Sequence, residues 1–202
     1  MGISLQQFKQ MKERLGGTTR APAPLLETGL RRAVNTHQII LGVDPSLRGT
    51  GYGVIQSVKS QPRALTYGVI ACPAAWAHSR CLVRIAQNLR DVIRSHHPTV
   101  CVIEGLFYAQ NLQTALTLGE ARGAALSVIA EAGLEIYELA PRKVKQAIVG
   151  HGAAQKIAVA KMVQRLLGLA EVPGADAADA LALALTHAQE TSRYTLHAPK
   201  RI

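Results

Sequence analysis

Continuous apolar runs alternate with amphipathic stretches along most of this chain. The runs at 38–44 and 99–104 each end in an acidic residue, as expected for strands buried on both faces of a sheet. Two more strands are predicted at 52–58 and 64–71, with turn residues before the first of them. They follow the first run so closely that the three should form an antiparallel meander. A short fifth strand is predicted at 134–139.

Amphipathic spacing predicts five helices between and after these strands. In the first, Leu82, Ile85 and Leu89 recur on one helical face. The predicted helices span 78–96, 111–132, 142–148, 154–167 and 175–191. Strands that are linked through helices should run parallel, with the helices packed on the sheet faces. We therefore expect an α/β protein with a five-stranded mixed sheet flanked by helices, an order that matches the ribonuclease H-like fold.

The charge of the chain favours a polyanionic partner. The formal net charge is +10 over 202 residues, which suits nucleic acid or an acidic membrane surface, although a solvated basic surface is the plain alternative. No apolar run approaches the roughly 20 residues of a membrane span. Cys72, Cys81 and Cys101 form no CxxC pair and lie in apolar runs, which indicates core residues in a reducing compartment. We expect a cytoplasmic protein.

Composition divides the chain into three parts. Residues 1–37 contain six basic and two acidic residues and a Pro-rich segment, so they predict either a mobile basic arm or a misassigned start codon. The patterned region, 38–192, is long enough for one domain with a sizeable core. Residues 193–202 form a basic tail with no predicted structure.

Four acids are the candidates for chemistry. Asp44 and Glu104 end two predicted buried strands, and Asp176 and Asp179 lie three residues apart on one face of the last helix. If that face covers the strand ends, the four carboxylates meet and would attract a hard cation such as Mg²⁺. Taken singly, Asp44 could make a turn, and the two helical acids could stabilise a helix N-terminus. Glu104 would otherwise be an awkward buried charge.

Several segments resemble, in chain order, motifs of the RuvC family of Holliday-junction resolvases. They are 40–54, 102–111, 118–123, 144–156 and 176–187. The resemblance implies a ribonuclease H-like nuclease domain over 38–192. It also implies that Asp44, Glu104, Asp176 and Asp179 are catalytic metal ligands, for two Mg²⁺ ions per site with Mn²⁺ as a possible substitute.

The resemblance further implies how such an enzyme works. A homodimer with two equivalent sites would nick opposed strands of a four-way DNA junction, leaving 5′-phosphates and 3′-hydroxyls. It would act in recombination and repair with the RuvA–RuvB branch-migration complex. The small residues Gly119 and Gly123 in the helix 111–132 would suit a two-fold interface, although packing of that helix on its own sheet is the ordinary alternative.

Other residues are candidates for contacts with DNA. Phe107 could stack on an unpaired base, and Lys156 could also stabilise charge on the scissile phosphate as a catalytic residue. The basic candidates for phosphate contacts are Arg142, Lys143, Lys145 and Lys156. The alternatives are a core phenylalanine and ordinary solvated basic residues.

Three other kinds of protein remain as alternatives. The glycines after Asp44 resemble the phosphate-binding turn of actin-like ATPases, but the chain contains no second copy of such a half. A DNA-binding module without catalysis would need none of the acids. Another ribonuclease H-like nuclease would share them and differ in substrate.

Overall fold

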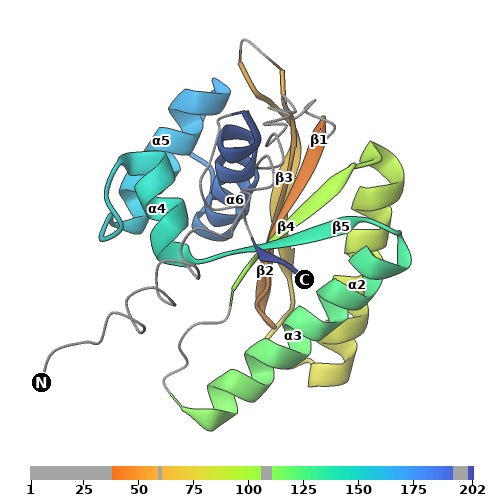
Figure 1. The fold of residues 1–202 in the computed structure, drawn as a ribbon. Coiled ribbons are helices and arrows are strands. Elements are labelled where there is room, and N and C mark those ends of the chain that lie inside the picture. Colours follow the sequence, from red (N-terminus) through yellow and green to blue (C-terminus); the bar gives the residue numbers. More distant parts are fainter. Residues whose placement is uncertain (1–37, 59–60, 106–110, 193–199) are drawn as a thin grey trace, which may run out of the picture. The chain divides into compact units, whose positions relative to one another are not determined.

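A mixed six-stranded sheet forms the centre of the molecule (Figure 1). The computed structural model describes residues 38–58, 61–105, 111–192 and 200–202. The strands are β1 (Ile39–Asp44), β2 (Gly49–Gln56), β3 (Arg63–Ala71), β4 (Val100–Glu104), β5 (Glu135–Leu139) and β6 (Lys200–Arg201). Their order across the sheet is β3-β2-β1-β4-β5-β6.

The predicted pairing of the strands is confirmed. β1, β2 and β3 form an antiparallel meander, and β1 pairs in parallel with β4, which pairs in parallel with β5. The connections from β3 to β4 and from β4 to β5 are helical, which allows the crossover that parallel strands need. The two acids that end β1 and β4 therefore lie on the same edge of the sheet.

Helices cover both faces of the sheet (Figure 1). The helices are α2 (His78–His96), α3 (Leu112–Glu131), α4 (Pro141–Val149), α5 (Lys156–Leu167) and α6 (Ala175–Ser192). One core packs α4, α5 and α6 against the sheet, and the other packs α2 and α3 against the opposite face. All three cysteines are buried and reduced, as predicted.

The start of β2 corrects the sequence-based assignment. We expected Gly49 and Gly51 to lie in a turn, whereas both belong to β2. Residues without a side chain are needed here because α6 crosses the sheet in direct contact with its backbone. A Cβ on Gly51 would lie 2.0 Å from the carbonyl oxygen of Asp176, and one on Gly42 would lie 2.0 Å from that of Ala180. The glycines thus allow α6 to approach the ends of β1 and β2.

The C-terminus supplies a sixth strand that was not predicted. Lys200 and Arg201 pair antiparallel with β5, and the Ile202 amide donates to the carbonyl of Ile136 at 3.0 Å. The basic strand pairs with β5, whose acids Glu138 and Glu135 form ion pairs with Lys200 and Arg201. The rest of the predicted tail and the predicted arm at 1–37 lie outside the described residues, so the limits of the domain stay a prediction. In the parts of the chain with assigned structure, no helix is both long and apolar enough to cross a membrane.

Candidate active site

The acids that end β1 and β4 face each other. Val43 of β1 is in register with Ile103 of β4, so the next residues, Asp44 and Glu104, are neighbours at the sheet edge. Both side chains line the cavity on the face that α6 covers, and a hydrogen bond joins the two carboxyl groups. Two carboxyl groups can bond in this way only when one of them carries a proton.

The environment explains why the pair keeps that proton. Burial, and then the charge of Glu104 and the hydrogen bond to it, raise the pKa of Asp44 to about 8. Burial also raises the pKa of Glu104, but the hydrogen bond with Asp44 and the charges of Lys156 and Lys145 oppose that rise. The pair therefore holds one proton at neutral pH, shared between Asp44 and Glu104.

Helix α6 brings the other two predicted acids to this edge. Asp179 is mostly buried, and its charge contributes to the raised pKa values of both Asp44 and Glu104. Asp176 lies one turn earlier, over the start of β2, where its Oδ2 is 2.9 Å from the position of a Cβ on Gly49. Asp179 thus lies close to the Asp44–Glu104 pair, whereas Asp176 lies at the edge of the site, over Gly49 of β2.

A cavity of about 200 Å³ joins these groups. Its polar lining consists of three acids and two lysines, Asp44, Glu104, Asp179, Lys145 and Lys156. Its apolar walls come from α4, α5 and α6, namely Pro141, Val144, Val159 and Leu183. The negative carboxylates of this cavity would repel a phosphodiester, so binding one requires a cation among the acids.

Lys156 begins α5 and reaches across to α6. Its ammonium nitrogen lies 3.0 Å from Oδ2 of Asp179. The hydrogen bond with Asp179 and its charge raise the pKa of Lys156, against the opposing effect of burial. Lys156 is therefore held charged at the mouth of the cavity, and its side chain is 65% exposed to solvent.

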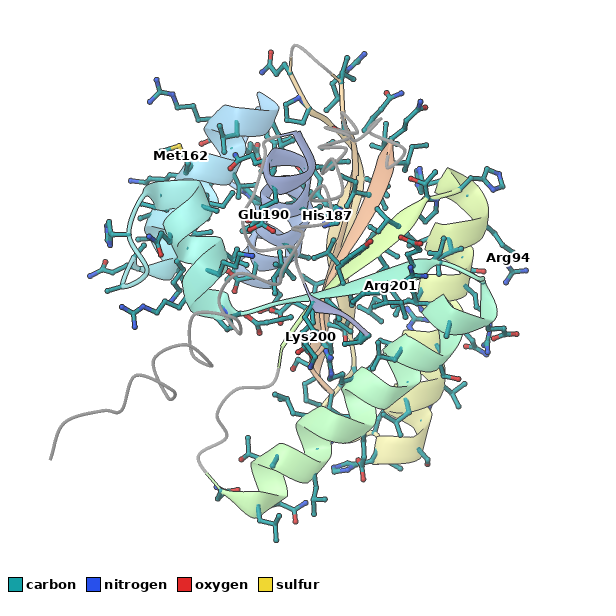
Figure 2. All side chains as sticks on the ribbon, viewed as in Figure 1. Arg94, Met162, His187, Glu190, Lys200 and Arg201 are labelled. Carbon is teal, nitrogen blue, oxygen red and sulfur yellow. The ribbon has the colours of Figure 1, made fainter. Side chains whose placement is uncertain are left out.

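The remaining predicted DNA contacts lie elsewhere. Lys143 makes an ion pair of 2.7 Å with Glu190 of α6 (Glu190 is labelled in Figure 2). Arg142 packs its aliphatic stem over Gly152, where a Cβ would lie 2.5 Å from its Cγ. Neither residue lines the cavity, so the structure separates them from Lys145 and Lys156. Phe107 lies outside the described residues.

The oxygen ligands in the cavity fit a hard divalent cation, although their present arrangement is not a finished metal site. Carboxylate oxygens are the ligands that Mg²⁺ prefers, and three of the acids line one cavity. Among the residues with assigned positions, no group of three or more His, Cys, Asp or Glu side chains has metal-binding geometry. A cation would have to displace the proton that Asp44 and Glu104 share.

Sequence reasoning missed one residue beside this site. Arg122 of α3 donates a hydrogen bond of 2.6 Å to the main-chain oxygen of Glu104, from the opposite face of the sheet. The signal was present, because Arg122 is a single basic residue among Ala, Gly and Leu in a helix that covers the sheet.

Comparisons with known proteins decide the family. A family model described as "Crossover junction endodeoxyribonuclease RuvC" matches residues 40–187, well over half of the chain. This chain belongs to the RuvC family. Its members are metal-dependent endonucleases of DNA recombination and repair that resolve crossover junctions, so this protein is a crossover junction endodeoxyribonuclease.

Individual relatives agree with the family assignment. A RuvC from Akkermansia muciniphila is 47% identical over 148 residues, covering 73% of this chain and 89% of the relative. One from Coxiella burnetii is 47% identical over 154 residues, covering 76% of this chain and 89% of the relative.

Solved structures agree on the fold. The Thermus thermophilus RuvC in complex with a Holliday junction substrate superposes with a TM-score of 0.75 at 33% identity, covering 82% of this chain and 100% of that chain. The yeast mitochondrial resolvase Ydc2 has a TM-score of 0.55 at 14% identity and covers 80% of this chain and 86% of that chain. It shares the fold. The predicted ribonuclease H-like fold is confirmed.

Proposed function

We propose that the cavity between β1, β4 and α6 is the nuclease centre, and that it nicks Holliday junctions with Mg²⁺ bound by its acids. The observation that carries this proposal is the Asp44–Glu104 pair, two buried acids that share one proton beside Asp179. A buried acid pair costs stability, and its carboxylate oxygens are ligands of the kind that a metal-dependent nuclease requires.

In this proposal the four acids have different parts. Asp44 and Glu104 would be the inner ligands, Asp179 would complete the set from α6, and Asp176 would join from the margin. Two Mg²⁺ ions in such a site, or Mn²⁺ in their place, supply a nucleophilic hydroxide and stabilise the leaving oxygen of a phosphodiester.

The lysines and the loop after β4 would hold the DNA. Lys156, kept charged by Asp179, is placed to stabilise the charge that develops on the scissile phosphate. Lys145, on the cavity wall, would neutralise a neighbouring phosphate. Arg142 and Lys143 would contact the backbone farther from the cut. Phe107, three residues after Glu104, would stack on an unpaired base at the junction centre.

A homodimer would provide two such sites, with α3 as the interface. The outer face of α3 carries Leu112 and Leu116, which are 75% and 55% exposed. Farther along the same face, Gly119 and Gly123 have nothing within 4 Å of a built Cβ. A bare face of leucines and glycines suits a second copy of the helix at close approach. A RuvA–RuvB complex is the partner expected of this family.

The interface can be tested with one substitution and one control. Gly123→Arg has room in the monomer but would block the partner helix, so we expect sedimentation to show a monomer with an unchanged melting temperature. Val83→Arg, on the exposed side of α2, should leave a dimer. A Gly123→Arg protein that stays dimeric would place the interface elsewhere.

The function is tested with a synthetic four-way junction. We expect paired nicks at symmetric positions on opposed strands, visible on a denaturing gel, in Mg²⁺ or Mn²⁺ and absent in EDTA. Linear duplex of the same sequence should stay intact. Cleavage of duplex and junction at equal rates would contradict junction specificity, and cleavage in EDTA would contradict the role of the acids.

A further inference from the structure

Arg122 lies on the side of the sheet opposite to the cavity and is buried, with its side chain 10% exposed. One guanidinium nitrogen donates to the main-chain oxygen of Glu104 at 2.6 Å, and another donates to Oε2 of Glu138 on β5. The planar guanidinium fork can satisfy two acceptors at fixed angles, which a lysine cannot do. Arg122 therefore bridges the end of β4 and the side chain of Glu138 on β5, on the α3 side of the sheet.

The peptide that Arg122 holds is the one that carries Glu104. On the β5 side, the amide of the next residue, Gly105, donates to the carbonyl of Leu139 at 2.9 Å. The backbone at Glu104 is thus fixed from two directions, by the ladder and by the arginine. The carboxylate of the same residue projects to the other face, into the cavity. Arg122 can influence its position without touching anything that binds there.

The C-terminal strand completes the arrangement through Glu138. The second carboxylate oxygen of Glu138 accepts a hydrogen bond from Lys200 at 3.1 Å, and the neighbouring Arg201 pairs with Glu135 at 3.0 Å. Figure 2 shows Lys200 and Arg201 on the short strand beside β5. Glu138 is only 13% exposed, so it is held between two cations with little solvent around it. Its carboxylate cannot turn away from Arg122 without losing Lys200.

We propose that Arg122 is a positioning residue for Glu104, and that the C-terminal strand β6 keeps it in place through Glu138. The proposal rests on the proposed catalytic role of Glu104. It gives a role in catalysis to residues beyond His187, where the match to the family ends. It also links the cavity to α3, the helix proposed to carry the dimer interface.

The expected consequence is a defect in rate rather than in binding. A displacement of about 1 Å in a group that holds reacting atoms can lower a rate roughly a hundredfold. Junction affinity depends on basic surface residues, which substitutions of the buried Arg122 and Glu138 leave in place. The positioning role therefore predicts a fall in the single-turnover rate at saturating junction, with little change in the dissociation constant.

Two variants and a matched control test the role of Arg122. Arg122→Lys keeps the charge but loses the fork, and Glu138→Gln keeps the shape but loses the charge. The control is Arg90→Lys, because Arg90 also makes two hydrogen bonds to one carboxylate, that of Glu131 on α3, and does not contact β4. For each protein we would measure the single-turnover rate in Mg²⁺, the junction dissociation constant in EDTA, and the melting temperature.

We expect Arg122→Lys and Glu138→Gln to lower the rate about ten- to a hundredfold, with the dissociation constant within about twofold of the wild-type value, whereas Arg90→Lys changes neither. Wild-type rates in both variants would overturn the proposal. So would a rate loss matched by the Arg90→Lys control. If Arg122→Lys is unfolded at the assay temperature, Glu138→Gln decides by the same criterion.

Two further variants separate the strand from the site itself. Lys200→Met should lower the rate only about two- to fivefold, because Lys200 is largely exposed and exposed ion pairs are weak. A wild-type rate in this variant would show that β6 does not contribute to the positioning of Glu104. Glu104→Gln tests the catalytic role of Glu104, on which the positioning role of Arg122 depends. If Glu104→Gln is inactive while the Arg122 and Glu138 variants cleave normally, only the positioning role fails. If Glu104→Gln cleaves normally, the proposed nuclease centre fails instead.

Discussion

The acids on the two faces of the sheet have opposite surroundings. On the α2–α3 face each acid has a basic partner: Glu138 lies between Arg122 and Lys200, Glu131 pairs with Arg90, and Glu120 with His78. On the α6 face, Asp44 and Glu104 are bonded to each other, with Asp179 close by. Asp179 and Glu190 of α6 also have lysine partners, so the contrast lies in Asp44 and Glu104, which are bonded to each other.

The difference separates acids that support the fold from acids that serve chemistry. A paired acid such as Glu138 joins two secondary-structure elements. An acid that faces other acids in a buried cavity resists ionisation, and strongly perturbed groups of that kind concentrate at functional sites. The contrast predicts that neutralising Asp44 or Glu104 removes activity without loss of stability. For Glu120 and Glu131 on the other face it predicts a small loss of stability and no loss of activity, whereas Glu138 should affect the rate through Arg122.

The largest effect is expected from Asp44→Asn. The Asp44–Glu104 pair already holds one proton in the metal-free protein at neutral pH, so an amide in place of Asp44 can keep the hydrogen bond to Glu104 and the fold. Cleavage should fall by about 100- to 1,000-fold, the range for loss of a principal transition-state stabiliser. Junction binding in EDTA should stay equal, because the acid pair carries the same charge with the amide as with the shared proton. Loss of binding in a mobility-shift assay would show that the acid is structural.

A smaller effect is expected from Lys156→Met. It removes the cation at the cavity mouth while keeping the length of the side chain. The single-turnover rate should fall about tenfold to a hundredfold. Lys161→Met is the control, because Lys161 is an exposed lysine of the same helix outside the cavity. Equal rates for the two variants would mean that Lys156 acts only as part of the general basic surface.

The unbalanced pair also predicts an unusual pH dependence of stability without metal. Asp44 titrates near pH 8 in the folded protein and near 3.8 in the unfolded chain. Between these values the folded protein holds a proton that the unfolded chain has lost, so stability decreases as pH rises, by up to about 1.4 kcal/mol per pH unit. Melting temperatures in EDTA from pH 5 to pH 8 would test this. Asp44→Asn should flatten the slope, and an equal slope in both proteins would contradict the assignment.

The smallest effect is expected from Glu131→Gln on the opposite face. Its ion pair with Arg90 is largely exposed, with Glu131 63% exposed, so the free energy of unfolding should fall by about 0.5 kcal/mol or less. Chemical denaturation and a cleavage assay would both be needed. A cleavage defect in this variant would erase the distinction between the two faces.

Much of the fold was predictable because local patterns and tertiary contacts agree. The apolar runs that end in Asp44 and Glu104 are strands, and the helix predicted at 78–96 has those bounds. Gly49 and Gly51 were misassigned to a turn because glycine signals both turns and close backbone approach. Nothing local in the sequence separates the two cases, since the helix that needs the space begins some 125 residues later.

The strand formed by Lys200 and Arg201 escaped prediction for a related reason. Two basic residues have no apolar alternation, and their pairing depends on the acids of β5. Likewise, the sequence could not rank the four basic candidates for DNA contact. In the fold, Lys145 and Lys156 line the cavity, whereas Lys143 pairs with Glu190 and Arg142 packs on Gly152.

The linear chain was thus sufficient to predict the family and the pairing directions of the first five strands, and to nominate four acids as candidates, because periodicity and motif spacing are local properties that need no contacts. Only the folded molecule decided which acids share a proton, which lysine is bound to them, and that Arg122 and Lys200 support Glu104 from behind. Those relations depend on distances between residues far apart in the chain, and burial and charge act through such distances.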